Sequence, residues 1–119
     1  MTPQKHLLTD LYSLQPSIQQ IRRKIHAFPE LGFEEHHTAQ LVAHHLKEWG
    51  LDVYEGIGRT GVVGVLRGSL EGTASVGLRA DMDALPIQEQ THLPYQSTLP
   101  GQMHACGHDG HTAILLMAA

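Results

Sequence analysis

The sequence has little cysteine, few aromatic residues and fewer basic than acidic residues. Its 119 residues include one Cys and 5% aromatic residues, and 8 Lys and Arg against 12 Asp and Glu give a formal charge of −4. One Cys cannot form an internal disulfide, and the N-terminus has no apolar stretch of signal-peptide length, so we expect a cytoplasmic location. The negative charge disfavours binding to a nucleic-acid backbone, and no run reaches the roughly 18 apolar residues that span a bilayer. We therefore expect no nucleic-acid partner and no membrane segment.

The spacing of apolar residues predicts a helix in the first quarter of the chain. It begins at Ser17, where Ser17 and Gln20 resemble a capping box, and it ends before Pro29. The basic run 22–24 lies mostly off the apolar stripe, so we interpret it as a solvated face. The stripe recurs at helical spacing and consists of Leu14, Ile18, Ile21, Ile25 and Phe28.

A second helix is predicted over Glu35–Trp49. Glu34 and Glu35 suit its positive N-terminal end, and Gly50 supplies a left-handed cap at the other end. Its buried face is expected to consist of Leu41, Val42, Leu46 and Trp49. Four histidines in this segment are expected to be surface or packing residues without a ligand role: His36, His37, His44 and His45.

The pattern then changes to short segments that favour β-structure. We predict strands at Leu51–Tyr54, Gly61–Leu66 and Ser75–Arg79, followed by an irregular proline-containing loop over Ala80–Gly101. A last helix is predicted from about His108. These elements predict an α/β fold in which helices pack on a three-stranded piece of sheet.

The predicted last helix is apolar on nearly every side over residues 113–119. A helix of this kind belongs inside a larger core, and it lacks a Gly, Pro, Lys or Arg stop signal. We therefore expect residues 1–119 to be the N-terminal portion of a longer polypeptide. The alternative is a small protein that covers this helix by forming oligomers.

Histidine is abundant, with ten in the chain, and it is the commonest metal ligand in proteins. Residues 104–111 read HACGHDGH and combine His, Cys and Asp at the density of a divalent metal site. Cys106 would precede a helix N-terminus, which favours its thiolate form. The alternative is that Cys106 is a small buried hydrophobe and His108 a capping residue.

Asp81 and Asp83 directly follow the predicted third strand. In an extended chain, residues two apart point to the same side, so both carboxylates can face one point. The alternative is that these residues only close a turn.

The motifs RADMDALP at 79–86 and MHACGHDGH at 103–111 occur with HAFPELGFEE at 26–35 and TGVV at 60–63. In this order they resemble the amidohydrolase branch of the aminoacylase/carboxypeptidase G metallopeptidase family. That branch includes hippurate hydrolases, N-acyl-L-amino-acid amidohydrolases and plant auxin-conjugate hydrolases.

The resemblance implies a metal-dependent hydrolase that cleaves an N-acyl amino acid to a carboxylic acid and a free amino acid. It implies a catalytic domain with a central mixed sheet flanked by helices, which carries two divalent ions: zinc, manganese, cobalt or nickel. It also implies a smaller domain that mediates homodimer contacts. On this basis residues 1–119 would be the N-terminal portion of the catalytic domain, incomplete at the C-terminus, without the smaller domain.

The resemblance also implies roles for individual residues. Cys106 and His108 would be metal ligands, and Asp83 would orient a ligand. Other branches carry a ligand His where this chain has Asp81. Four residues would surround the ligands: Asp81, His104, Asp109 and His111. His26 lies in the upstream motif.

The family's general base is a Glu from a Glu-Glu pair downstream of the second metal motif, and it does not occur in residues 1–119. We therefore expect no hydrolysis of hippurate or N-acetyl amino acids by the 119-residue chain, even with added zinc, manganese, cobalt or nickel. The measurement is product release by the purified chain. Turnover that survives purification and is lost in Cys106→Ala would contradict this expectation. The other class of function is a non-catalytic truncated product that at most binds a metal ion or a partner chain.

Overall fold

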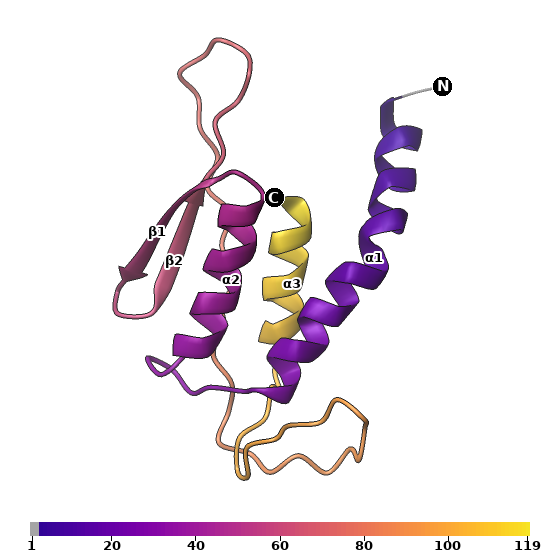
Figure 1. Cartoon of the computed structure of the whole chain (residues 1–119), viewed down its shortest axis with the longest axis vertical. Helices are drawn as coiled ribbons and strands as arrows, with labels where there is room; N and C mark the ends of the chain where they lie inside the picture. The colour runs from indigo at the N-terminus through magenta and orange to yellow at the C-terminus, as the bar shows by residue number, and fades with distance from the viewer. Residues whose placement is uncertain (1–2) are drawn as a thin grey trace.

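The computed structural model describes residues 3–119 and contains three helices and one β-hairpin in that range (Figure 1). Helix α1 packs on α3, and α2 packs on both strands of the hairpin. In chain order the elements are α1 (Pro3–Ala27), α2 (His36–Glu48), β1 (Asp52–Ile57), β2 (Gly61–Val65) and α3 (His108–Ala118). The predicted α/β class is confirmed.

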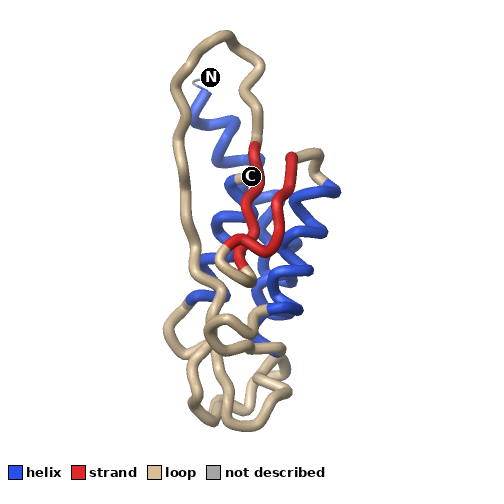
Figure 2. The backbone as a smooth tube through the Cα atoms, turned by 90° about the vertical axis from the view of Figure 1, so that its left-hand side faces the viewer, coloured by secondary structure: helices blue, strands red, loops and turns tan. Residues whose placement is uncertain are grey.

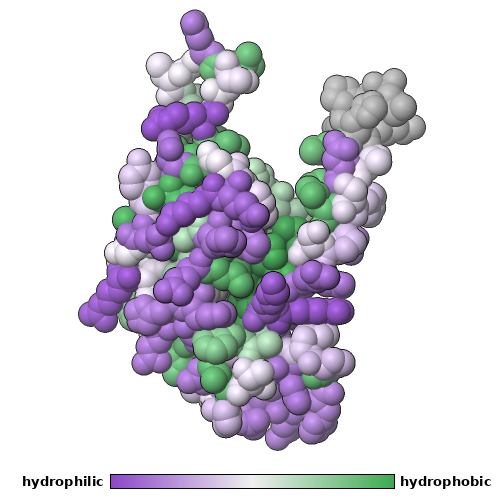
Figure 3. Space-filling view, in the orientation of Figure 1, coloured by the Kyte–Doolittle hydropathy of each residue, from purple (hydrophilic) through white to green (hydrophobic). Residues whose placement is uncertain are grey.

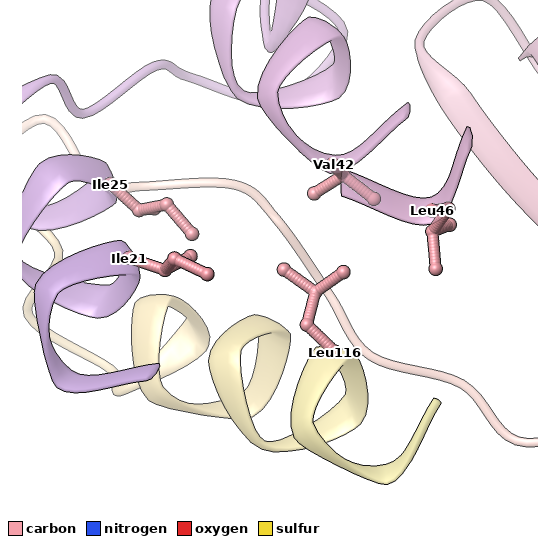
Figure 4. Packing of buried hydrophobic residues seen from close by; sticks show 5 residues of the cluster. All are labelled: Ile21, Ile25, Val42, Leu46 and Leu116. Atoms are coloured by element: carbon pink, nitrogen blue, oxygen red, sulfur yellow. The ribbon is translucent and has the colours of Figure 1, made fainter. Parts of the chain in front are cut away.

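The core lies where the three helices face one another. Ile21 and Ile25 of α1 are one helical turn apart, as are Val42 and Leu46 of α2. These side chains meet Leu116 of α3 (Figure 4). Parts of the predicted helix faces therefore supply the core, and burial of these aliphatic side chains drives the association of α1, α2 and α3.

The prediction of buried helix faces is wrong for Leu14, Phe28 and Trp49, which are 47%, 37% and 41% exposed. Leu14 lies in the part of α1 that extends beyond the core, and Phe28 and Trp49 follow the ends of α1 and α2.

Helix α1 is longer than predicted. It begins at Pro3 and passes through Pro16, so the predicted start and capping box at Ser17 are wrong. Pro16 removes one backbone donor, but the hydrogen bonds on either side of it hold the helix together. The helix ends at Ala27, before Pro29, as predicted.

The N-terminal half of α1 extends beyond the core. An open apolar groove between α1 and α3 is lined by Leu8, Leu11, Tyr12, Gln15 and Met117. Apolar side chains gather in the angle between α1 and the remaining elements (Figure 3). No helix in the described range is long and apolar enough to cross a membrane.

Strands β1 and β2 form an antiparallel hairpin with a bulge between Glu55 and Ile57. The third predicted strand, Ser75–Arg79, is wrong: this segment is irregular, with Val76 87% and Leu78 69% exposed. A strand requires a hydrogen-bonded neighbour, and residues 75–79 have none in the described chain (Figure 2). The mixed sheet is therefore not formed in residues 3–119, where the sheet has two strands.

The predicted loop 80–101 is irregular, as expected, and is attached at both ends. Leu85 pairs with Met103 through two backbone hydrogen bonds of 2.9 and 3.0 Å. Farther along, the Thr98 backbone N–H donates to the Ala27 carbonyl oxygen at 2.9 Å. These bonds hold the loop beneath the C-terminal end of α1.

The Glu30 carboxylate caps the N-terminus of α2. It is buried and accepts hydrogen bonds from the backbone N–H groups of His37 at 2.9 Å and Thr38 at 2.7 Å. The Thr38 hydroxyl donates to it at 2.6 Å. We expected Glu34 and Glu35 to serve this end, but the carboxylate in contact comes from the preceding turn.

Glu35 has a different structural role. Its buried carboxylate accepts from the backbone N–H of Phe33 at 3.1 Å and from the hydroxyl of Thr60 at 2.5 Å. Thr60 lies in the turn between β1 and β2, so this pair attaches the hairpin to the entrance of α2. The upstream motif thus contains two buried carboxylates that join elements.

We predict that Glu30→Gln lowers the free energy of unfolding by about 1–3 kcal/mol. The amide offers one acceptor oxygen in place of two, so one backbone N–H at the buried start of α2 loses its charged acceptor. Urea denaturation followed by circular dichroism measures this. Glu34→Gln changes an exposed neighbour in the same way and serves as the matched control. Equal stability of the two variants would contradict the capping role.

Candidate metal centre

The site is built at the N-terminus of α3. The residue before the helix, Gly107, has φ of 89°, a left-handed conformation that a side chain would strain. This turn places His108 at the first position of α3. The His108 ring there faces the segment that contains Asp83. The Gly107 turn therefore leads the chain into α3 at His108.

Asp83 holds the His108 ring through one of its nitrogens. His108 Nδ1 lies 2.8 Å from Asp83 Oδ1 and 3.0 Å from the Asp83 carbonyl oxygen. Both partners are acceptors, so Nδ1 carries the hydrogen. In the neutral ring Nε2 then carries the free lone pair, which is the arrangement of a metal-binding imidazole oriented by a carboxylate.

Two further donor groups lie beside this ring. Asp81, His108 and His111 each offer a ligand atom, and these atoms all lie within 4.8 Å of one another. His108 and His111 are one helical turn apart with ring centroids separated by 5.4 Å. The Thr112 hydroxyl donates to the Asp81 carbonyl oxygen at 2.8 Å, which attaches the Asp81 segment to α3. Two imidazoles and a carboxylate are a donor set suited to first-row divalent metals.

The predicted site residues are therefore only partly gathered. Cys106 is exposed and is not a member of the three-residue group. Asp81 and His111, predicted to surround the ligands, lie with His108 in that group. Their roles and those of Cys106 and Asp83 stay predictions.

His104, from the same motif as His108, is only 4% exposed. Neither ring nitrogen has a hydrogen-bond partner in the described part of the chain. Burial lowers the pKa of His104, and the neighbouring Asp109 carboxylate only partly opposes this effect. The ring is therefore neutral at neutral pH, and it packs against His26 with centroids 6.4 Å apart.

Asp109 belongs to a separate buried network. Its Oδ2 lies 2.8 Å from Arg22 Nε and 2.8 Å from His26 Nδ1. The other nitrogen of His26, Nε2, lies 3.0 Å from Oε1 of the buried Glu89. The interpretation of run 22–24 as a solvated face is therefore wrong for Arg22. The spacing of Arg22 and His26, one helical turn apart, was the available signal.

Glu89 is a member of this network that the sequence did not reveal. Burial alone would raise its pKa, but hydrogen bonds from Thr91, the Ser97 backbone N–H and His26 lower that pKa below its usual value. The Ser97 N–H lies 2.9 Å from Glu89 Oε1. A single acidic residue in a polar loop carries no pattern that separates it from exposed loop residues.

Comparison with known proteins shows which family this chain resembles. The chain has an α/β fold and offers imidazole and carboxylate donors near the N-terminus of α3. Residues 77–119, which contain the whole cluster, match the model of peptidase family M20/M25/M40. The chain is similar to this family, and its resemblance to the amidohydrolase branch is confirmed.

Individual relatives show the same similarity. Hippurate hydrolase of Campylobacter jejuni is 57% identical over 114 residues, which cover 96% of this chain and 30% of the relative. Thermostable carboxypeptidase 1 of Saccharolobus solfataricus is 52% identical over 114 residues, covering 95% of this chain and 29% of the relative. The chain thus spans about 30% of the length of the curated relatives it matches.

A solved structure has the same fold. The crystal structure of the Bacillus subtilis YXEP protein, described as a dinuclear metal binding peptidase from the M20 family, matches with a TM-score of 0.81 and 40% identity. The match covers 88% of this chain and 30% of that chain. The arrangement of helices and hairpin is therefore one found in a metal-binding peptidase.

We predict that the chain loses stability in acid, partly through Glu89. Its pKa is lower in the folded than in the unfolded chain, so its contribution is present above the unfolded value and is lost as pH falls through the folded value. Urea titrations between neutral pH and about pH 3 measure the slope. Glu89→Gln is expected to flatten this slope, whereas the exposed control Glu71→Gln leaves it unchanged. Identical slopes for wild type and Glu89→Gln would refute the assignment.

Proposed function

We propose that these residues form the metal-binding portion of a hydrolase that cleaves the amide bond of N-acyl amino acids to a carboxylic acid and a free amino acid. Relatives named hippurate hydrolase and N-acetyl-L-cysteine deacetylase support this substrate class. The observation that carries the proposal is the His108 ring, held by Asp83 beside Asp81 and His111.

The donor set fits a divalent ion. His108 would ligate through Nε2, because Asp83 occupies Nδ1. Asp81 and His111 would supply the neighbouring donors. Cys106, exposed and two residues before His108, would supply a thiolate. A bound divalent ion of the zinc, manganese, cobalt or nickel type would polarise the amide carbonyl oxygen and lower the pKa of a water molecule.

The residues of this chain have positioning tasks. Asp83 keeps the His108 hydrogen on Nδ1 and so keeps Nε2 available as a ligand. The Thr112 hydroxyl holds the backbone of Asp81 against α3. No acidic pair in this chain is assigned as the general base: Glu35 accepts hydrogen bonds from Thr60 and Phe33, which is a structural role.

The complete activity therefore needs groups beyond these residues, consistent with the larger size of the relatives. We propose that the base and further ligands come from such segments, that the complete site holds two ions, and that the enzyme is a cytoplasmic homodimer. The 119-residue chain by itself is proposed to be inactive.

The metal site is tested by titrating the chain with Co²⁺ and following the visible and near-ultraviolet absorption spectra. We expect tetrahedral or five-coordinate visible bands, and a thiolate charge-transfer band that disappears in Cys106→Ala. Replacing a ligand in Asp81→Asn or His111→Asn is expected to weaken binding by about tenfold or more. His44→Asn, an exposed histidine of α2, is the control.

The reaction is tested on a longer polypeptide that contains these residues, using a panel of hippurate and N-acetyl amino acids with added metal. We expect hydrolysis that is lost in His108→Ala. If the longer polypeptide binds Co²⁺ but has no hydrolase activity, the result would favour the non-catalytic metal-binding alternative. Unaltered Co²⁺ affinity in Asp81→Asn and His111→Asn would overturn the ligand assignment.

A further inference from the structure

Four ionisable side chains meet at the junction of α1, α3 and the loop 89–97. Arg22 and His26 come from α1, Asp109 from α3 and Glu89 from the loop. Asp109 is 1% exposed, and His26 and Glu89 are also buried. Three segments that are far apart in the sequence are therefore joined through one network.

Both ring nitrogens of His26 face carboxylate oxygens. Nδ1 lies 2.8 Å from Asp109 Oδ2, and Nε2 lies 3.0 and 3.2 Å from the two oxygens of Glu89. Carboxylate oxygens only accept, so both contacts are hydrogen bonds only when both ring nitrogens carry a hydrogen. Arg22 Nε adds a further donor at 2.8 Å from Asp109 Oδ2, so the contacts of His26 and Arg22 converge on the two carboxylates.

Moving one member of this network away from the others is unfavourable, because His26, Glu89 and Asp109 are buried and only Arg22 is partly exposed. Removing one partner leaves an uncompensated charge away from water, which is strongly unfavourable. Glu89 is held in turn by the Ser97 backbone N–H at 2.9 Å and by the Thr91 hydroxyl. The carboxylate that faces His26 is therefore itself fixed in orientation.

The network also selects the rotation of α3 about its axis. Residues 113–118 are apolar on nearly every side, so apolar burial distinguishes weakly between rotations. Asp109 is a charged group that must face Arg22 and His26. With Asp109 on that side, the flanking His108 and His111 face the Asp81 segment. A rotation by one residue, about 100°, would turn both imidazoles away.

We propose that His26 and Glu89 are positioning residues for the metal centre, acting through Asp109 to hold α3 in the rotation that gathers Asp81, His108 and His111. This inference rests on the proposed function, because it assigns the geometry of the same site. Neither residue touches the three donor side chains. Their effect is transmitted by the helix that carries two of those donors.

The test uses two variants of the chain, His26→Leu and Glu89→Gln, with Glu35→Gln as the control. Glu35 is also a buried carboxylate with hydrogen-bond partners, Phe33 and Thr60, but it attaches the hairpin to α2 and does not belong to the network. Each variant is first brought to conditions in which circular dichroism shows it to be folded. If His26→Leu does not fold, Glu89→Gln, which retains the size of the side chain, decides the test.

Two measurements separate positioning from stability. The Co²⁺ dissociation constant of the folded chain is expected to rise about tenfold in His26→Leu and Glu89→Gln and to stay at the wild-type value in Glu35→Gln. Ring ¹H–¹⁵N correlation spectra of the metal-free chain are expected to show His26 protonated on both nitrogens and His108 protonated on Nδ1. Glu89→Gln is expected to change both sets of signals, and Glu35→Gln neither.

The outcomes distinguish this inference from the function on which it rests. A wild-type chain that binds no Co²⁺ would remove the proposed metal centre, while the ring spectra would still decide whether Glu89 controls His26 and His108. Wild-type Co²⁺ affinity in the folded His26→Leu and Glu89→Gln variants, with unchanged His108 signals, would overturn the positioning role.

Discussion

The burial of the Asp109 carboxylate at the start of α3 is the constraint on which the rest of the structure depends. A buried carboxylate requires partners, and α1 supplies them as Arg22 and His26. Because the adjacent residue is His108, the requirement of one charged group determines where an imidazole points. Apolar contacts among the helices stabilise the core, whereas the contacts of Asp109 fix the rotation of α3 about its axis.

The buried carboxylate of Glu30 has a similar task at the N-terminus of α2. Glu30 satisfies the first N–H groups of the helix, and its carbonyl oxygen accepts from the Ala84 backbone N–H at 2.8 Å. That bond places the end of the segment containing Asp81 and Asp83. In the upstream motif, Glu30 thus attaches both the start of α2 and the segment near Asp83 through hydrogen bonds.

The buried parts of the helix faces could be predicted because local spacing determines which side chains share a face. Ile21, Ile25, Val42 and Leu46 recur at helical intervals, and helical geometry requires such residues to share a face. The third strand could not be predicted correctly, because Ser75–Arg79 has β-favouring residues but no strand beside it in the described range. Side-chain preference favours an extended segment, but a strand also requires a neighbouring strand to which it can hydrogen-bond.

The sequence by itself determined which chemical groups this chain can offer: a Cys, imidazoles and carboxylates within two short motifs, and amphipathic helices that can carry them. Only the tertiary structure decided which of those groups meet. Asp81 joins His108 and His111, and Glu89 meets His26 across 63 positions of the chain. These pairings depend on the paths of loops and the rotation of α3, which are set by contacts between distant segments. The spacing of residues along the sequence does not predict such long-range contacts.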